Sequence, residues 1–206
     1  MASLGGGSKE IATEMSVELK SQKAALRAGV LARLLKLSAD VQARESIRLN
    51  SNLLRQAVWR KAQSVLLFAP MKGEPDIWAL LEQALAERKQ VALPWYDREQ
   101  GVYLARLIKD MTDDLHVGSF GIREPLPTCP AVSLNRLDLV LVSGVAFDLH
   151  GRRLGRGKGY YDRLLAGYGG TKCGVAFDEQ IVAEVPAEPH DIRVNCILTP
   201  TRWIET

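Results

Sequence analysis

Three short runs of apolar residues limit what this chain can fold into. They read SVLLFA at 64–69, DLVLV at 138–142 and KCGVAF at 172–177, and each is rich in residues that favour strands. Nearly continuous apolar runs are typical of strands that are buried on both faces of a parallel sheet. Because these runs alternate with segments of helical periodicity, we expect an α/β sheet with helices on both faces.

The helical segments lie around the expected strands. In residues 16–37 apolar side chains recur at helical spacing, and Ser38 is a suitable N-cap for a second helix that ends near residue 62. Residues 109–136 contain two glycines and three prolines and little periodicity, which predicts a long ordered loop or a lid-like excursion. Further helices are expected at 76–88 and 160–165, and further strands at 90–93, 101–108 and 195–199.

The composition excludes several classes of protein. The chain has 206 residues, of which 47% are apolar, so it can bury a core, and no run of about 20 apolar residues could span a membrane. Its three widely spaced cysteines argue against a disulfide framework and for a reducing compartment, which we take to be the cytoplasm. We expect residues 1–15 to form a flexible leader and residues 16–206 a single α/β domain.

The positive charge is concentrated in one segment. The formal net charge is +3, yet residues 151–163, GRRLGRGKGYYDR, contain five basic residues and a single acidic one, so the remainder of the chain is close to neutral. Proteins that bind duplex nucleic acid usually spread lysine and arginine along a whole face. One dense cationic loop fits a compact polyanion such as a nucleotide better.

Within this segment, residues 155–159 contain three alternating glycines directly before an expected helix. Glycine tolerates positive φ and has no Cβ, so backbone N–H groups can converge on an anion, and the helix start adds its own unpaired N–H groups. Arg153, Arg156 and Lys158 supply positive charge for a triphosphate. The segment follows the strand at 138–142, and open α/β sheets bind ligands beyond the carboxyl ends of their strands. The spacing matches neither a P-loop nor a dinucleotide fingerprint, and a solvated basic loop stays open as the alternative.

The first expected helix offers a second cationic element. Lys20, Lys23 and Arg27 follow one another at spacings of three and four, so they share one face of the helix. Either these are ordinary long side chains that reach solvent near a helix end, or the face leaves the core and overhangs the anion site.

Several acidic residues are candidates for a metal site. Asp162 begins the helix after the glycines, where it could cap the helix or bind magnesium, and Asp191 could bind magnesium or be a turn residue. Two aspartates near a triphosphate would suffice for magnesium, which also takes phosphate oxygens and water as ligands. Asp148 and Asp178 are further candidates, and His190 is a possible acid or base.

The sequence around the glycines resembles that of a known family. Residues 142–165, VSGVAFDLHGRRLGRGKGYYDRLL, closely resemble the signature of the 5-formyltetrahydrofolate cyclo-ligases, also called methenyltetrahydrofolate synthetases. The resemblance extends over nearly the whole chain after the leader. Shorter matching pieces occur in the family's order at Lys23–Arg27, Gly73–Glu74, Val91–Pro94, Phe120–Pro125 and Ala187–Asp191.

The resemblance implies a reaction and a fold. The reaction is the ATP- and magnesium-dependent conversion of 5-formyltetrahydrofolate to 5,10-methenyltetrahydrofolate, with release of ADP and phosphate. The fold is a three-layer α/β/α sandwich with a mostly parallel sheet, similar to the ribose-phosphate isomerase and CoA-transferase group. The implied partner is the folate substrate, with no nucleic acid and no membrane, and we expect a monomer.

The resemblance also assigns roles to residues of this chain. The magnesium ligands would be Asp162 and Asp191, and Arg153, Arg156 and Lys158 would act in catalysis. The ATP contacts would come from Lys23, Arg27, Arg153, Leu154, Gly155, Arg156, Gly157, Lys158, Gly159, Tyr160 and Tyr161. The folate contacts would come from Arg27, Glu74, Arg156, Gly157, Lys158, Gly159 and Tyr160.

The implied chemistry agrees with these residue types. As a hypothesis, the formyl oxygen attacks the γ-phosphate, N10 then closes the ring at the formyl carbon, and phosphate leaves. Phosphoryl transfer needs mainly positioning and cationic stabilisation, which a glycine loop with lysine, arginine and magnesium provides. The family's pattern differs at Pro75, Trp95 and Ser143, which we interpret as changes that tune substrate binding. A folate or nucleotide store without turnover, and a nucleic-acid binder that uses residues 151–163, stay open as alternatives.

Overall fold

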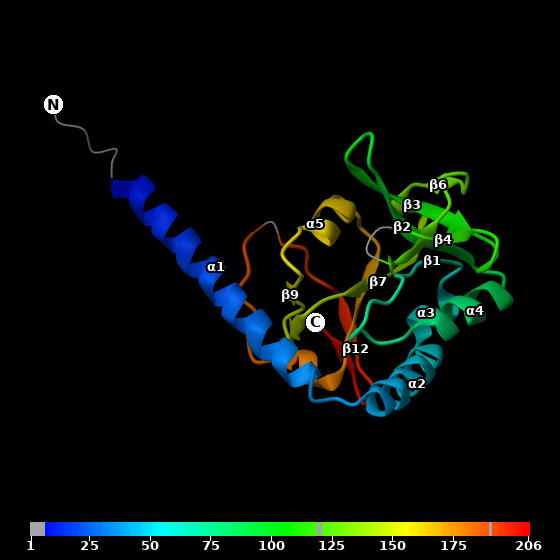
Figure 1. Ribbon diagram of the computed structural model, residues 1–206, viewed down its shortest axis with the longest axis horizontal. Coiled ribbons are helices and arrows are strands. Elements are labelled where there is room, and N and C mark those ends of the chain that lie inside the picture. The colour runs from blue at the N-terminus through cyan, green and yellow to red at the C-terminus, as the bar shows by residue number, and fades with distance from the viewer. Residues whose placement is uncertain (1–6, 119–120, 190) are drawn as a thin grey trace.

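A mixed eight-stranded sheet forms the centre of the computed structural model, which describes residues 7–118, 121–189 and 191–206 (Figure 1). Strands β12, β10, β7, β1 and β2 are parallel neighbours. Antiparallel strands extend this group on both sides, with β13 next to β12, β3 next to β2, and β6 next to β3. In sheet order the strands are β13 (Trp203–Glu205), β12 (Cys196–Leu198), β10 (Thr171–Val175), β7 (Leu139–Ser143), β1 (Ser64–Leu66), β2 (Gln90–Asp97), β3 (Val102–Ile108) and β6 (Ala131–Val132).

Helices cover both faces of this sheet. On one face lie α2 (Ala39–Arg55), α3 (Ala57–Lys61) and α4 (Trp78–Ala86), whose buried side chains pack against alternate strand residues such as Val65. On the other face α5 (Tyr160–Leu164) packs against the intervening residues, such as Leu66. Because side chains alternate across a strand, each apolar run supplies both layers, and the predicted fold class is confirmed. The relation to the isomerase and transferase group stays a prediction.

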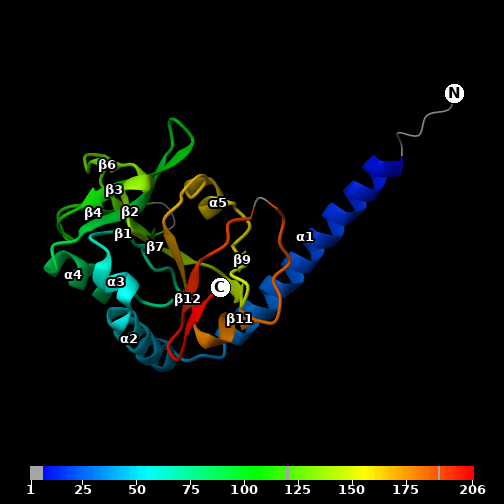
Figure 2. The ribbon, with the colours of Figure 1, turned by 180° about the vertical axis from the view of Figure 1, so that it is seen from behind.

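A smaller sheet contains the start of the cationic segment and packs against the first helix. It consists of β11 (Ile181–Val182), β8 (Ala146–Asp148) and β9 (Arg153–Leu154), and α1 (Gly7–Leu34) packs on it through Val30 and Leu34. Figures 1 and 2 show the N-terminal half of α1 extending away from the rest of the molecule. No helix within the described ranges is long and apolar enough to cross a membrane.

Several boundaries differ from those that the sequence predicts. Ser38 is the N-cap of α2, as expected, with its hydroxyl accepting from the Val41 N–H at 3.3 Å, but extended backbone at Gln56 ends that helix and separates α3 from it. Helix α1 begins at Gly7, inside the segment that we assigned to a leader, while residues 1–6 lie outside the described part. The division into leader and domain stays a prediction.

The segment 109–136 is more regular than the expected loop. It contains β6, the hairpin of β4 (Leu115–Val117) and β5 (Arg123–Pro125), and a 3-10 turn at Leu134–Arg136. Its strands are two or three residues long, so their local sequence gives no periodicity to detect.

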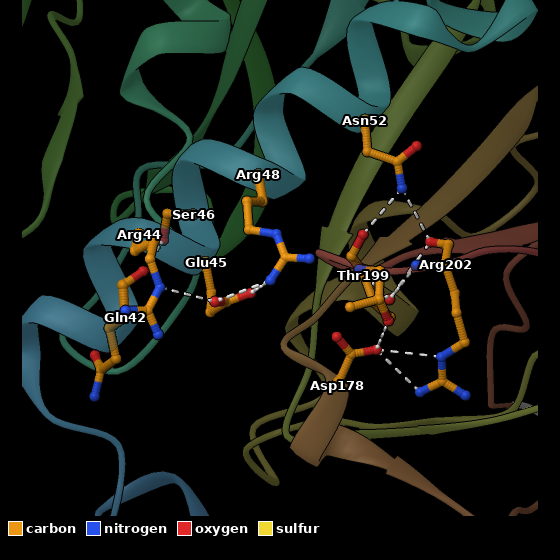
Figure 3. A network of polar contacts seen from close by, with 10 residues as sticks. Gln42, Arg44, Glu45, Ser46, Arg48, Asn52, Asp178, Thr199 and Arg202 are labelled. Carbon is orange, nitrogen blue, oxygen red and sulfur yellow. Dashed lines mark hydrogen bonds and ion pairs between the residues drawn. The ribbon is translucent and has the colours of Figure 1, made fainter.

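Helix α2 is fixed to the C-terminal strands by a polar contact that Figure 3 shows. The Asn52 amide donates to the backbone carbonyls of Thr199 at 3.1 Å and Arg202 at 3.3 Å. The turn between β12 and β13 also contacts Asp178, whose carboxylate accepts hydrogen bonds from the Thr201 hydroxyl and the Arg202 guanidinium. Asp178 therefore holds the turn between β12 and β13, and these contacts lend no support to a role in a metal site.

Candidate active site

The glycine loop, residues 155–159, connects β9 to α5. Gly157 has φ +90° and Gly159 has φ +60°, and Gly159 is the N-cap of α5, so both positions need the left-handed conformation that glycine adopts at little cost. Arg156, Gly157 and Lys158 are exposed. Within the described chain the N–H groups of residues 156–159 donate no hydrogen bond, which leaves them available to an anion.

Helix α1 reaches this loop through its basic face. The Arg27 guanidinium donates to the Gly155 carbonyl oxygen at 2.8 Å, and a Cβ on Gly157 would lie 3.8 Å from the same guanidinium. The Lys23 ammonium lies 2.9 Å from the Glu188 carboxylate and 2.7 Å from that of Asp191. Of the two interpretations of this face, the structure therefore favours the one in which it overhangs the loop.

The ion pairs of Lys23 change its protonation. Burial by itself would lower the pKa of this ammonium, but hydrogen bonds and charges from Asp191 and Glu188 outweigh burial and raise the pKa above its ordinary value. Lys23 is thus firmly cationic, and it links α1 to the segment that carries Asp191.

On another side, the loop contacts the turn after β1. The Arg156 guanidinium donates to one carboxylate oxygen of Glu74, at 3.1 Å from Nη2 and 3.3 Å from Nε. The other oxygen of Glu74 accepts from the Met71 N–H at 3.0 Å, so this carboxylate is fixed, and its side chain is only 6% exposed. Since β1 is a parallel strand, the loop lies beyond the carboxyl ends of the sheet strands, as the sequence predicts.

Arg153 lies inside the protein and not at the phosphate-facing surface. It is 7% exposed, its guanidinium donates to Asp162 at 3.1 Å, and it stacks over the Tyr161 ring at 5.2 Å from the centroid. Leu154 and Tyr161 are buried as well. Leu154 packs in the core between the small sheet and α1, and Tyr161 packs in the core between α5 and the main sheet, so direct contact of these three side chains with ATP is not supported.

The two predicted magnesium ligands lie on segments that contact each other. Asp162 accepts from the Ile192 N–H at 3.2 Å, next in sequence to Asp191, and Asp191 accepts from the Glu188 N–H at 2.7 Å as well as from Lys23. Asp162 lies in the first turn of α5, where its charge favours the helix N-terminus, but it is not the N-cap residue, which is Gly159. The described residues contain no cluster of three or more histidine, cysteine, aspartate or glutamate side chains able to hold a metal. Two carboxylates beside a phosphate loop still fit magnesium, which completes its shell with phosphate oxygens and water.

Aromatic rings adjoin the other end of the glycine loop. Tyr160 packs edge-on against Tyr103 of β3 at 4.2 Å between centroids, and Tyr103 lies 4.6 Å from Tyr96 of β2. The Arg163 guanidinium stacks over Tyr103 at 5.2 Å. Burial raises the pKa of the Tyr161 hydroxyl to about 12, and burial likewise raises that of Tyr160, so both phenols stay neutral.

A family model for 5-formyltetrahydrofolate cyclo-ligases matches residues 19–200. The chain belongs to this family. The cyclo-ligase of Mycolicibacterium smegmatis is 37% identical over 147 residues, which cover 69% of this chain and 76% of the relative, and the mouse cyclo-ligase is 28% identical over 204 residues, covering 89% and 96%. Membership identifies the chain as a ligase of folate metabolism.

The fold of this chain also matches the folds of solved structures. The chain superposes on 5,10-methenyltetrahydrofolate synthetase from Aquifex aeolicus with a TM-score of 0.80 and 37% sequence identity, covering 89% of this chain and 92% of the other. A synthetase from Mycoplasma pneumoniae matches with a TM-score of 0.69, covering 86% and 98%. At 21% identity, this second similarity concerns the fold alone.

For this cyclo-ligase family member, sequence reasoning identified most but not all of the residues at the loop. Glu188, which pairs with Lys23, lies in Ala187–Asp191, one of the short segments that resemble the family. The sequence therefore contained a signal that could have identified this residue. Tyr103 joins the site only through tertiary packing, whereas Arg163, which stacks on it, belongs to the cationic segment 151–163. Asp148 is fully buried and accepts from backbone N–H groups of its own turn, and His190 lies outside the described residues.

Proposed function

We propose that this protein uses ATP to convert 5-formyltetrahydrofolate to 5,10-methenyltetrahydrofolate, with release of ADP and phosphate. The observation that carries the proposal is the convergence of Arg27, Arg156 and Lys158 on a glycine loop whose N–H groups have no partners in the described chain. Backbone donors with nearby cations are the arrangement that phosphoryl transfer requires. ATP, when bound, supplies the phosphoryl group that turns the formyl oxygen into a leaving group.

The cations of the loop differ in how they are held. Arg27 is oriented by its bond to Gly155, and Arg156 is held by Glu74, so each presents its remaining donors in a fixed direction. Lys158 is exposed and makes no hydrogen bond or ion pair with the described chain. An unpaired ammonium amid three glycines is free to follow the charge that develops on a transferred phosphoryl group, and we assign Lys158 this role.

Magnesium would be held by Asp162 and Asp191, and it would neutralise charge on the phosphate oxygens. Both carboxylates already accept two hydrogen bonds, from Arg153 and Ile192 in one case and from Lys23 and Glu188 in the other. These contacts fix the carboxylates at the edge of the phosphate loop, which supports the assignment.

The folate would lie on the aromatic side of the loop. The rings of Tyr160, Tyr103 and Tyr96 offer flat apolar surface, and Glu74, which Arg156 binds, offers a fixed carboxylate at the same loop. Such surfaces suit a fused heteroaromatic ring with a polar edge. We further propose that the enzyme binds neither nucleic acid nor membranes, since the excess of positive charge lies within residues 151–163 and the remainder of the chain is close to neutral. We also propose that it acts as a monomer in the cytoplasm.

The test is spectrophotometric detection of the methenyl product from 5-formyltetrahydrofolate, with and without ATP and magnesium. Product formation that depends on ATP, with one phosphate released for each methenyl group formed, is expected. Tight folate binding without either product would instead identify a folate store, and oligonucleotide binding that falls steeply with salt would identify a nucleic-acid binder.

Lys158→Ala should reduce turnover by about 10³-fold, in line with the loss of other transition-state phosphate clamps. Lys36→Ala, which removes an exposed lysine just after α1, is the matched control and should leave turnover unchanged. Nearly normal turnover in Lys158→Ala would mean that this ammonium is only solvated surface charge.

A further inference from the structure

Arg163 of α5 is a cation of the site to which the proposed function gives no role. Other arginines of the cationic segment each pair with a carboxylate at 2.6 to 3.1 Å, namely Arg152, Arg153 and Arg156. Arg163 is exposed and makes no ion pair within the part of the chain that the structure describes. Lys158 is also unpaired, but it is assigned to the phosphoryl group. Arg163 is therefore available to another anionic group of a ligand.

The guanidinium of Arg163 is held in place although it has no anion. It stacks over the Tyr103 ring at 5.2 Å from the centroid, and its Nη1 lies 3.0 Å from where a Cβ on Gly159 would be. Stacking uses the plane of the guanidinium and leaves the N–H groups along its edge free to donate. Arg163 thus presents donors of the geometry that binds a carboxylate through two parallel hydrogen bonds.

Arg163 and Glu74 contact opposite ends of the glycine loop. Glu74 is bound by Arg156, near the start of the loop, and Arg163 lies beside Gly159, the last loop residue. The Tyr103 ring beneath Arg163 belongs to the aromatic surface proposed for the folate. The site therefore has a carboxylate acceptor at one end and a cationic donor at the other, with aromatic rings adjoining the cationic end.

The neighbouring cation of β3 is directed elsewhere. Arg106 stacks on Trp95 at 4.1 Å from the ring centroid, and its guanidinium donates to the Cys129 carbonyl oxygen. Because side chains alternate along a strand, Arg106 and Tyr103 lie on opposite faces of β3. Arg163 therefore offers an anion at the aromatic rings a partner that Arg106 cannot offer.

The proposed substrate has a matching asymmetry. Its pteridine end carries amino and ring N–H groups that can donate to a carboxylate, and its other end is a glutamyl group that carries carboxylates. We propose that Arg163 binds a carboxylate of the glutamyl end, with the pteridine edge at Glu74, and so makes the site select a substrate with an acidic tail. The inference rests on the proposed function, because it takes the substrate and its place beside the loop from there.

The experiment compares 5-formyltetrahydrofolate with a neutral analogue in which the glutamyl carboxylates are carboxamides. With saturating ATP, kcat and KM for both would be measured in the native protein, Arg163→Gln and Arg60→Gln. Arg60 is an exposed residue of α3, on the other face of the sheet from α5, so Arg60→Gln is the matched control and should change nothing.

We expect Arg163→Gln to raise KM for the acidic substrate about tenfold, as the loss of a hydrogen bond to a charged group does. We expect unchanged kcat, because Arg163 lies away from the reacting atoms and its contact is the same in the ground state and the transition state. KM for the neutral analogue should change less than about twofold, since it has no carboxylate to lose a partner.

A merely structural role of the stack on Tyr103 would give a different result. In that case Arg163→Gln would raise KM for both substrates by the same factor. This result, or equal KM values of the native protein for the two substrates, would overturn the inference and leave the proposed function standing. Arg163→Lys keeps the charge but not the planar guanidinium, so its KM for the acidic substrate should lie between those of the native protein and Arg163→Gln.

Failure of the native protein to form the methenyl product from either substrate with ATP would overturn the proposed function, and the inference with it. If Arg163→Gln does not fold, Arg163→Met replaces it under the same expectations, because it keeps an apolar stem against Tyr103.

Discussion

Removing the Arg153 guanidinium should mainly lower the stability of the protein, because this group contacts other protein side chains and not a surface that faces the ligand. Arg153→Met keeps most of the apolar stem but deletes the charge that lies 3.1 Å from Asp162 and 5.2 Å from the centre of the Tyr161 ring. The side chain of Arg153 is 5% exposed and that of Asp162 is 24% exposed, so most of this pair is removed from water.

The magnitude follows from that burial. Breaking a fully buried ion pair costs about 3–5 kcal/mol, and water can partly reach Asp162, which lowers the cost. Loss of the cation–π contact adds about 0.5–1 kcal/mol. We therefore expect the free energy of unfolding to fall by about 2–4 kcal/mol and Tm to fall by about 5–15 °C in a chain of this size.

The assay is urea unfolding of Arg153→Met, Asp162→Ala and the double variant, which isolates the coupling between the two side chains. We expect a coupling of about 1–2 kcal/mol. Arg152→Met is the control, because Arg152 pairs at 2.6 Å with Glu184, whose side chain is 72% exposed. Arg152 also lies 3.9 Å from the buried Asp148, but Asp148 keeps its hydrogen bonds from the N–H groups of His150, Arg152 and Val185, so the substitution should cost under about 1 kcal/mol. If Arg153→Met loses no more free energy of unfolding than Arg152→Met but has no turnover, the structural role is refuted. Arg153 would then act by direct contact with the substrate.

Two further substitutions test other carboxylates. Asp191→Asn should raise the magnesium concentration needed for half-maximal turnover several-fold, because it removes one of the two proposed carboxylate ligands. An unchanged magnesium titration would exclude Asp191 as a ligand. Asp138→Asn should lower the free energy of unfolding at pH 7. In the variant this free energy should also decrease less than in the native protein as the pH is lowered. Hydrogen bonds from the Gln63 N–H and from Ser64 lower the pKa of Asp138, so its contribution is present above the unfolded pKa of about 3.9 and is lost as pH falls through the folded value. Equal acid sensitivity of variant and native protein in urea unfolding would contradict this assignment.

The fold could be predicted where local sequence determines it. The buried strands at 64–69, 138–142 and 172–177 are all present within three residues at each end, because their apolar runs report burial on both faces. The strand predicted at 90–93 instead runs to Asp97, past Pro94. Neighbour β1 pairs only as far as Ala92, and beyond it β3 alone continues the ladder, so the boundary depends on tertiary pairing that periodicity does not report.

The site could be predicted as a segment but not side chain by side chain. Arg153 and Arg156 have the same residue type and lie three positions apart, yet one is buried and the other is exposed. The difference arises because Arg153 pairs opposite Phe147 in the small sheet, whereas Arg156 follows the end of β9. The strand pairing that turns one arginine inward involves no more than two residues of β9, too few to leave a pattern in the sequence.

A continuous set of polar contacts joins both ends of the glycine loop to α1. Arg153 at the end of β9 binds Asp162 on α5, Asp162 accepts from the Ile192 N–H, and Asp191 next to it accepts from Lys23 on the helix. In this arrangement one ammonium, that of Lys23, serves two carboxylates, those of Asp191 and Glu188. Phosphate bound on the loop would compete with these carboxylates for the same cation, so a divalent ion that satisfies the carboxylates would release Lys23 toward phosphate. The geometry therefore predicts that metal and nucleotide bind cooperatively, as a consequence of how the charges of this loop are shared.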